Sequence, residues 1–221
     1  MYIPDDFQEQ RIEVLHDLMT QYPFATLFCN GSNGLDANHL PFELDTEIGE
    51  FGALRAHVAR DNSVWRDMKN GDEVLVVFQA GDAYISPNWY PSKHEHHRQV
   101  PTWNYRVVHV YGKVSIHDDE RYVRGVVARL TRQHEASQDE PWKMSDAPKD
   151  YLESMLKAIV GIEIEIVKIQ GKFKLGQNKS EQDILGAVAG LKQSGQQAMA
   201  ELMCPSSKAN FKKMENKNEN I

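Results

Sequence analysis

The chain has 221 residues, with 25 Lys and Arg against 32 Asp and Glu, so its formal net charge is −7. Hydrophobic residues make up 41% and charged residues 26%, a globular composition that excludes collagen-like and wholly disordered classes. No run of the sequence approaches the roughly 18 apolar residues of a membrane-spanning helix. Nucleic-acid phosphates are bound by clustered Lys and Arg, so the acidic balance disfavours direct DNA binding.

The N-terminus and the cysteines indicate the cellular compartment. MYIPDDFQEQ is acidic and has no basic flank before an apolar stretch, so it does not resemble a targeting signal. Cys29 and Cys204 are the only cysteines and lie far apart in the sequence, which favours reduced thiols over a disulfide framework. We therefore expect a cytoplasmic protein without a membrane anchor.

Hydrophobic periodicity predicts the elements of the first part of the chain. Apolar residues recur at three- and four-residue steps before Thr20, as one buried face of a helix requires. The turn residues Asn30-Gly31-Ser32-Asn33-Gly34 separate two β-favouring segments and predict a hairpin. The expected elements are a helix at 7–20, strands at 23–30, 35–44 and 51–59, a short helix at 60–70 and a strand at 73–80.

The second part of the chain begins with a loop at 81–101 that is rich in aromatic residues, Pro and His. IEIEIVKIQG alternates apolar and polar residues, as a strand with one solvated face does. Asp118 and Asp119 supply acceptors near one helix start, and Ser180 is a plausible N-cap of another. The expected elements are a strand at 102–116 with a bend at Gly112, helices at 118–134 and 149–160, a strand at 162–171 and a helix at 180–191.

These elements predict a mostly β protein with peripheral helices, in the α+β class. About six strands without regular βαβ alternation favour a small closed or split antiparallel barrel with helices on its outside. We expect residues 1–204 to form a single domain. Residues 205–221 are polar and poor in large apolar side chains, which predicts a disordered tail.

The familiar catalytic motifs are missing from the sequence. There is no GxxxxGK[ST], GxGxxG, HExxH, paired CxxC or GxSxG, which disfavours P-loop, Rossmann, zincin and α/β-hydrolase chemistry. HEHH at 94–97 contains possible zinc ligands but has no second ligand pair elsewhere in the sequence. We therefore interpret HEHH as a solvated polar turn and predict no metal site.

Two segments have the composition of a ligand site. Residues 84–105 place Tyr and Trp rings among hydroxyl and amide donors and a lysine, which suits a planar anionic ligand such as a flavin or haem. The same aromatic residues could equally cover the barrel mouth or form a subunit interface. At residues 55–65 a strand passes into a helix start that carries Arg60, a pattern that holds phosphate in some proteins but is also that of a plain helix start.

Ordered motifs then connect the sequence with a family. The resemblance is to the PaiB-type negative transcriptional regulators, and it covers nearly the whole chain apart from the C-terminal tail. The motifs are PFATL at 23–27, NHLPFEL at 38–44, HVARDNSVW at 57–65, YISPNWYPSK at 84–93, VPTWNY at 100–105, LTRQHE at 130–135, IVGIEIEI at 159–166 and GKFKLGQNKS at 171–180.

The resemblance implies an FMN-binding split β-barrel, usually a homodimer with FMN between its subunits. It also implies repression of protease synthesis and sporulation functions. Phe173 and Gly176 stand where the family more often has Trp and Ser. The cofactor-binding residues expected from the resemblance are His57, Arg60, Asn62, Ser86, Trp89, Lys93, Thr102, Trp103, Asn104, Lys174, Gln177 and Asn178.

We therefore expect an FMN-binding homodimeric regulator whose action is indirect or linked to redox state. Direct DNA binding is not supported by charge, and the helices at 118–134 and 149–160 are too far apart in sequence for a helix-turn-helix. The alternative is an FMN-dependent oxidoreductase acting on a small substrate, in which the flavin supplies the chemistry. Haem binding is a third and weaker hypothesis.

Overall fold

The computed structural model describes residues 1–31 and 34–204. These residues form two compact units. The larger unit comprises residues 10–78 and 108–170, and the smaller unit comprises the described parts of 1–9, 79–107 and 171–221. The expected turn at Ser32-Asn33 and the expected disordered tail at 205–221 lie outside the described residues.

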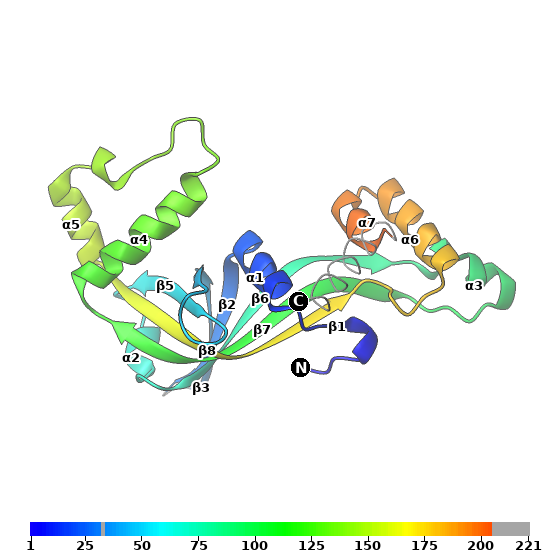
Figure 1. Ribbon diagram of the computed structural model, residues 1–221, viewed down its shortest axis with the longest axis horizontal. Helices are drawn as coiled ribbons and strands as arrows, with labels where there is room; N and C mark the ends of the chain where they lie inside the picture. The colour runs from blue at the N-terminus through cyan, green and yellow to red at the C-terminus, as the bar shows by residue number, and fades with distance from the viewer. Residues whose placement is uncertain (32–33, 205–221) are drawn as a thin grey trace, which may run out of the picture. The chain divides into compact units, whose positions relative to one another are not determined.

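An eight-stranded antiparallel sheet is the main element of the fold (Figure 1). Its strand order is β3-β2-β6-β7-β8-β5-β4, with β1 paired to β8. β6, β7 and β8 are long enough to supply residues to both units. The strands are β1 (Gln8–Glu9), β2 (Phe24–Gly31), β3 (Gly34–Pro41), β4 (Glu43–Asp45), β5 (Ala53–Ala59), β6 (Glu73–Ile85), β7 (Thr102–His117) and β8 (Ile159–Lys174).

Alternation along the strands builds the core of the larger unit. In β2 the residues Ala25, Leu27 and Cys29 are buried, and the residues between them point to the opposite face. β2 pairs with β6 so that Leu27 lies opposite Val76, and both are fully buried. On β8, Ile162 is also fully buried. The period of two in the sequence therefore separates the core from the outer face of the sheet.

Helices belong to both units. Asp119 caps α4 (Glu120–Glu135) by accepting from Tyr122 N at 2.8 Å, and Ser180 caps α6 (Glu181–Gln193) by accepting from Asp183 N at 3.3 Å, which confirms the expected caps. The larger unit contains α1 (Ile12–Gln21), α2 (Val64–Asp67), α4 (Glu120–Glu135), η3 (Met144–Asp146) and α5 (Lys149–Lys157). The smaller unit contains η1 (Asp5–Phe7), η2 (Pro87–Trp89), α3 (Pro91–His96), α6 (Glu181–Gln193) and α7 (Gln197–Met203).

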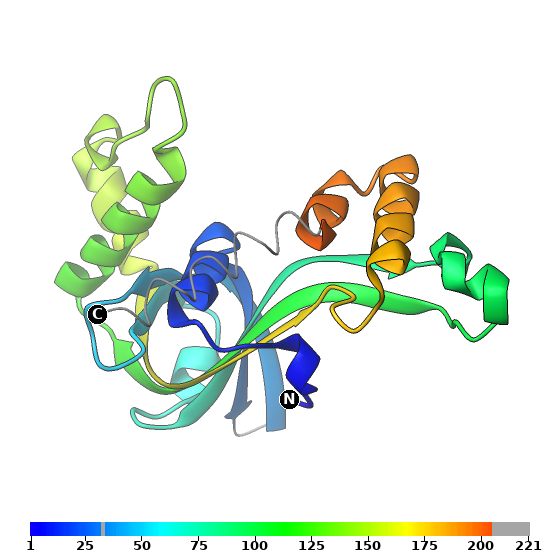
Figure 2. The same ribbon diagram turned by 45° about the vertical axis from the view of Figure 1, so that its right-hand side comes forward.

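Close packing on glycine organises the smaller unit, in which α6 lies beside α7 and near α3 (Figure 2). A Cβ added to Gly190 would lie 2.3 Å from Cδ2 of Trp89, and one added to Gly186 would lie 2.1 Å from the Trp89 carbonyl oxygen. The absent side chains thus let η2 pack directly on the helix. Neither glycine was predicted to have this role, because the pairing is visible only in three dimensions.

The prediction of a mostly β protein with peripheral helices is confirmed, but several boundaries were wrong. The first helix begins at Ile12, because residues 5–9 form η1 and the short strand β1. The helix expected at 60–70 extends only from Val64 to Asp67, since Met68 returns to an extended backbone conformation. The strand expected at 35–44 is two strands, β3 and β4.

The segment 81–101, expected to be a loop, is largely regular. β6 continues to Ile85, where Ala83 and Ile85 are buried as its alternation requires. Pro91 then occupies the first turn of α3, where its fixed φ and missing N–H are tolerated. HEHH consequently lies at the end of a helix and the residue that follows, not in a turn.

Candidate functional site

The expected cofactor-binding residues fall into two groups. His57, Arg60 and Asn62 lie in the larger unit, on β5 and on the segment before α2. The other nine lie in the smaller unit: Ser86, Trp89, Lys93, Thr102, Trp103, Asn104, Lys174, Gln177 and Asn178. Each group is therefore considered within its own unit.

Arg60 is held by the residues that flank α4 and α5. Its Nη1 donates to Asp118 Oδ2 at 3.0 Å, its Nη2 donates to Asp118 Oδ1 at 2.5 Å, and its Nε donates to the Lys157 carbonyl at 2.6 Å. The hydrogen bond raises the pKa of Arg60 and lowers that of Asp118. The guanidinium already has a bidentate anionic partner, so a phosphate would have to displace Asp118 to be held by it.

Asn62 has two partners close to the start of α2. Its Nδ2 donates to Asn38 Oδ1 at 2.8 Å, and its Oδ1 accepts from Val64 N at 3.0 Å. The side chain thus joins β3 to the helix start and satisfies a helix N–H, in the way that Asn does at turns. These contacts are those of the plain helix start that the sequence also allowed.

His57 lies on β5 opposite Gly161 of β8. Its Nδ1 is buried and has no hydrogen-bond partner. Burial lowers the pKa of the ring below the ordinary value of 6.5, because desolvation disfavours the charged imidazolium. His57 is therefore held in the neutral form, which makes it a poor partner for a phosphate.

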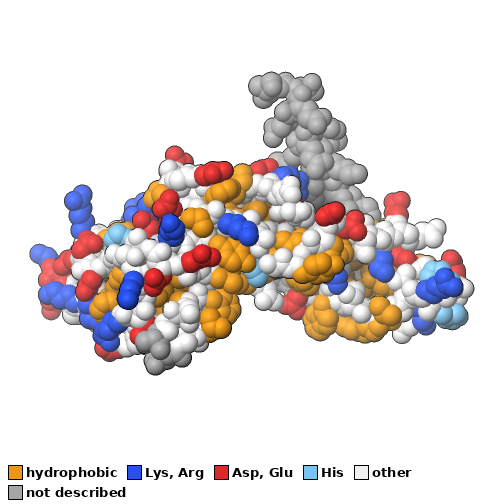
Figure 3. Space-filling model, turned by 90° about the horizontal axis from the view of Figure 1, so that it is seen from below, with side chains coloured by type: hydrophobic (Ala, Val, Ile, Leu, Met, Phe, Trp, Pro, Cys, Tyr) orange, Lys and Arg blue, Asp and Glu red, His pale blue; other side chains and the backbone are white. Residues whose placement is uncertain are grey.

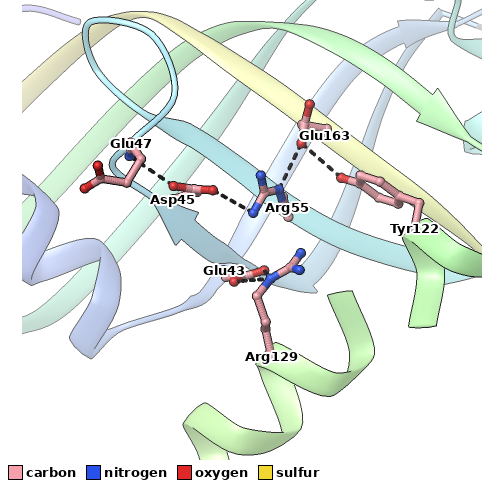
Figure 4. Close-up of polar contacts among 7 residues, drawn as sticks. All are labelled: Glu43, Asp45, Glu47, Arg55, Tyr122, Arg129 and Glu163. Carbon is pink, nitrogen blue, oxygen red and sulfur yellow. Dashed lines mark hydrogen bonds and ion pairs between the residues drawn. The ribbon is translucent and has the colours of Figure 1, made fainter. Parts of the chain in front are cut away.

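Next to His57 on the same face of β5, Arg55 belongs to a polar cluster that sequence reasoning missed (Figure 4). Arg55 forms ion pairs with Asp45 at 2.7 Å and Glu163 at 2.9 Å, and Tyr122 of α4 donates to Glu163 at 3.4 Å. Burial, followed by the Glu163 charge, raises the pKa of Tyr122. Since α4 packs against β4 and β5, we interpret this cluster as a structural attachment of the helix to the sheet.

The smaller unit brings Lys174, Thr102 and Trp103 together where β7 begins and β8 ends. The Lys174 ammonium donates to Thr102 Oγ1 and to the Trp103 carbonyl at 2.7 Å. Burial lowers the pKa of Lys174, and the positive charges of Lys172 and Lys179 lower it further. This cation is therefore held among other cations, an environment that an anion would stabilise.

Beside this lysine, two aromatic rings remain open to solvent. Trp103 is 54% exposed and Tyr84 is 45% exposed, and their rings meet edge-on with centroids 5.9 Å apart. Exposed rings of this size are usual at sites that bind planar ligands or other proteins. Lys174, Thr102, Trp103 and Tyr84 are called the Lys174 cluster below.

Several other expected residues have contacts within the smaller unit. Asn104 is 1% exposed and donates to Met203 Sδ at 3.1 Å. Ser86 is the N-cap of η2 and accepts from Asn88 N, while Trp89 packs on α6. Gln177 closes a turn by donating to the Phe173 carbonyl at 2.5 Å and accepting from Leu175 N at 2.7 Å.

Lys93 and Asn178 remain accessible. The Lys93 side chain is half-buried on α3, and Asn178 is exposed after β8. Phe173 is 8% exposed and lies under the Arg106 guanidinium, so its ring is not available for stacking. The structure thus places only part of the expected group at the surface.

Asp183 is a buried acid that no motif in the sequence singles out. Its carboxylate accepts from Ser92 N at 3.1 Å and Ser92 Oγ at 2.7 Å, and it is 3% exposed. Gln99 donates to Ser92 Oγ and accepts from Lys179 Nζ at 2.7 Å. This network joins α6 to α3, and a buried carboxylate of this kind is stabilised only while its donors are present.

Two hollows lie in the larger unit. One, of about 240 Å³, is lined by Cys29, Asp36 and Asp67 among others. Burial raises the pKa of the Cys29 thiol, and the charges of Asp36 and Asp67 raise it further. That acidic lining disfavours an anionic ligand. The other, of about 480 Å³, lies along the second half of α4 and is lined by Ala128, Thr131, Arg132, Glu135, Ala136, Pro141, Trp142, Lys143, Met144 and Ser145.

Metal ligands do not gather at any point in the described part of the chain, where no group of three or more His, Cys, Asp or Glu side chains could hold an ion. His94 and His96 are exposed on α3, and His94 Nε2 lies 3.3 Å from the Asn88 carbonyl. None of the described helices is long and apolar enough to cross a membrane.

The fold defines the class of protein. The structure resembles the FAD and haem binding protein from Mycobacterium smegmatis, with a TM-score of 0.57 and 17% identity over 80% of this chain and 78% of that one. It also resembles the flavocytochrome Anf3 from Azotobacter vinelandii, with a TM-score of 0.55 and 12% identity over 76% and 69% of the two chains. The fold is that of the flavin-binding split barrels, as expected.

The family follows from the sequence comparisons. Residues 1–168 match the family described as "Putative FMN-binding domain". The chain is 32% identical over 206 residues to "Protease synthase and sporulation protein PAI 2" of Bacillus subtilis, covering 92% of this chain and 96% of that protein. The chain therefore belongs to the PaiB-type FMN-binding family.

Proposed function

We propose that this protein is an FMN-binding homodimer that negatively regulates transcription, including genes for protease synthesis and sporulation-type functions. The family match over residues 1–168 is the observation that supports FMN as the cofactor. The regulatory part is supported by the name of the Bacillus subtilis relative. The homodimer is supported by the resemblance between the sequence motifs and those of the family.

The Lys174 cluster fits the chemistry of FMN. A phosphate beside the Lys174 ammonium would relieve its repulsion with Lys172 and Lys179, and the Thr102 hydroxyl offers a hydrogen bond at the same place. The exposed Trp103 ring offers an apolar surface for a planar heterocycle. We propose that these residues bind the cofactor, together with Lys93 and Asn178.

The remaining expected residues support the site rather than contact the ligand in this proposal. Trp89, Ser86, Asn104 and Gln177 fix the segments that carry the Lys174 cluster. Arg60 and Asn62 contact a phosphate only if they exchange the partners they have within the chain. Bound FMN would supply reversible one- or two-electron chemistry, while the protein positions the ring and neutralises the phosphate.

The experiment is a titration of the untagged protein with FMN, followed by quenching of flavin fluorescence and by the visible absorption spectrum. We expect saturation at one FMN per chain. Riboflavin is the matched control, since it has the same ring without the phosphate, and it should bind at least about 10-fold more weakly if a charged hydrogen bond holds the phosphate. No uptake of FMN would refute the cofactor assignment.

A flavin-dependent oxidoreductase is the second candidate, and the exposed Trp103 and Tyr84 rings favour it, because a substrate needs access to the flavin face. Steady-state consumption of NAD(P)H by the FMN-loaded protein with an added acceptor distinguishes the two. Turnover supports the oxidoreductase. Absence of turnover, combined with altered transcription in cells that lack the protein, supports the regulator.

A further inference from the structure

The outward face of three strands in the larger unit has an unusual composition. In antiparallel pairs the two opposed residues point to the same side of the sheet. Thr26 lies opposite both His39 of β3 and Val77 of β6, so these three share the face that is turned away from Leu27. The outer β2–β3–β6 face consists of Phe24, Thr26, Phe28, Asn30, Leu35, Ala37, His39, Pro41, Glu73, Leu75 and Val77.

Large apolar side chains on this face are exposed to solvent. Leu35 is 88% exposed, Phe24 is 67% exposed and Phe28 is 38% exposed. The outer face of an antiparallel sheet is usually polar, yet Glu73 is the only Asp, Glu, Lys or Arg at these positions. Single exposed apolar residues are common, but a contiguous set on neighbouring strands marks an interaction surface.

The polar side chains in the middle of the face already bind each other. Thr26 Oγ1 and His39 Nδ1 lie 3.0 Å apart, and the Phe24 ring stacks on the His39 ring with centroids 6.4 Å apart and an angle of 28°. A partner could therefore cover this region without leaving the Thr26 hydroxyl unpaired, which removes the main cost of burying polar groups. Burial of this face against an apolar partner would therefore leave few polar groups unpaired.

We propose that the outer β2–β3–β6 face binds the same face of a second copy of this chain. Each copy has a net charge of −7, so a surface nearly free of charge is one on which two copies meet with little electrostatic repulsion. The only acid on this face is Glu73, where β6 begins, and the face has no Lys or Arg that would attract an acidic partner. An apolar, uncharged surface is complementary to itself, as a two-fold interface requires.

The inference rests on the proposed homodimer and adds the surface that forms it. The test measures molar mass by size-exclusion chromatography with light scattering, for the full chain and for Phe28→Glu and Leu35→Glu. Each substitution occurs on both copies of a two-fold interface. It therefore buries two carboxylates in an apolar contact, where they lose hydration and repel each other. We expect wild type at about twice 25.3 kDa and at least a ~100-fold increase in the dimer dissociation constant for both variants.

Val167→Glu is the matched control, because Val167 is 45% exposed on a strand outside this face, and it should stay dimeric. Circular dichroism of each variant verifies folding, and Leu35→Glu is the variant whose side chain is most exposed. A monomeric wild type would overturn the homodimer together with this surface. A dimer that survives both face substitutions would overturn only the surface, and FMN titration of the wild type tests the cofactor separately.

Discussion

The surroundings of Lys174 favour a bound anion, because its ammonium is partly buried and repelled by two other lysines. We predict that Lys174→Gln weakens FMN binding by about 10- to 100-fold, the range for loss of a hydrogen bond to a charged group. Riboflavin binding should change little. Exposed Lys168→Gln is the control for a general loss of positive charge. Equal FMN affinities of wild type and Lys174→Gln would place the phosphate elsewhere.

The same residue gives FMN binding a pH dependence. The pKa of Lys174 lies below the ordinary 10.5, so this ammonium loses its proton earlier than other lysines as the pH rises. We predict that FMN affinity falls as the pH rises toward 10.5, and that the fall is smaller in Lys174→Gln. Fluorescence titrations at a series of alkaline pH values measure both curves. Parallel curves for the two proteins would contradict the prediction.

The partly buried His57 ring predicts that the stability of the folded protein falls as the pH becomes acidic. Burial lowers the pKa of its ring in the folded state, whereas the unfolded chain has the ordinary 6.5. Between these two pKa values the unfolded state binds more protons, so stability falls as the pH falls below 6.5. His57→Asn should therefore lose less stability than wild type between pH 7.5 and pH 5, by on the order of 1 kcal/mol.

Urea unfolding followed by circular dichroism at both pH values measures this difference, and exposed His134→Asn is the control. If wild type and His57→Asn lose stability equally, the ring is protonated in the folded protein. That result would also reopen the possibility that His57 binds the phosphate, because an imidazolium is a phosphate partner.

At the scale of elements, the contact between α6 and η2 depends on glycine. Gly186→Ala would place a Cβ 2.1 Å from the Trp89 carbonyl oxygen, and backbone cannot move as easily as a side chain. We predict a loss of about 1–3 kcal/mol of unfolding free energy, the range for overpacking. Gly125→Ala in α4 is the matched control, since its Cβ would meet only the end of the Arg129 side chain and the change should stabilise by about 0.5–1 kcal/mol. Thermal unfolding of both variants measures the contrast.

Strands and long helices were predictable because each has a period that the sequence shows. β2, β5, α4 and α6 appear within a few residues of the expected bounds, with the expected caps Asp119 and Ser180. The segment 81–101 was not predictable as an ordered element. Its Pro and aromatic residues are typical of a loop. The packing of Trp89 on Gly186 and Gly190 of α6, which helps to fix η2 in place, is visible only in three dimensions.

The candidate site also could be predicted from the sequence only in part. Motif resemblance selected Lys174, Thr102 and Trp103, which lie together although they are far apart in sequence. The resemblance could not show that Asn104 is buried against Met203, because an Asn in a motif looks the same in the sequence whether its side chain contacts a ligand or the core. The sequence places Tyr84 in an aromatic segment and Lys172 and Lys179 in a basic stretch. Only the spatial arrangement shows that the Tyr84 ring meets Trp103 and that the two lysines lower the pKa of Lys174.

At the scale of the whole molecule, net charge limits how the proposed regulation of transcription could operate. Figure 3 shows Lys and Arg side chains mixed with Asp and Glu side chains over the face seen there, in place of a continuous basic surface. Two copies together carry 2 × (−7) = −14. Such a dimer is repelled by the phosphate backbone, whose neutralisation supplies most of non-specific DNA affinity.

We therefore predict that the FMN-loaded protein does not bind a labelled 30-base-pair duplex measurably at about 150 mM salt. Typical repressors still bind DNA non-specifically under this condition, with Kd values of roughly 10⁻⁴ to 10⁻⁶ M. Fluorescence anisotropy with unrelated and promoter-derived duplexes is the measurement. Binding that weakens steeply with salt would show phosphate contacts and contradict the prediction. If no duplex binds while transcription changes in cells lacking the protein, regulation must pass through another macromolecule or through the redox state of the flavin, because an acidic dimer without phosphate contacts has no direct means of occupying an operator.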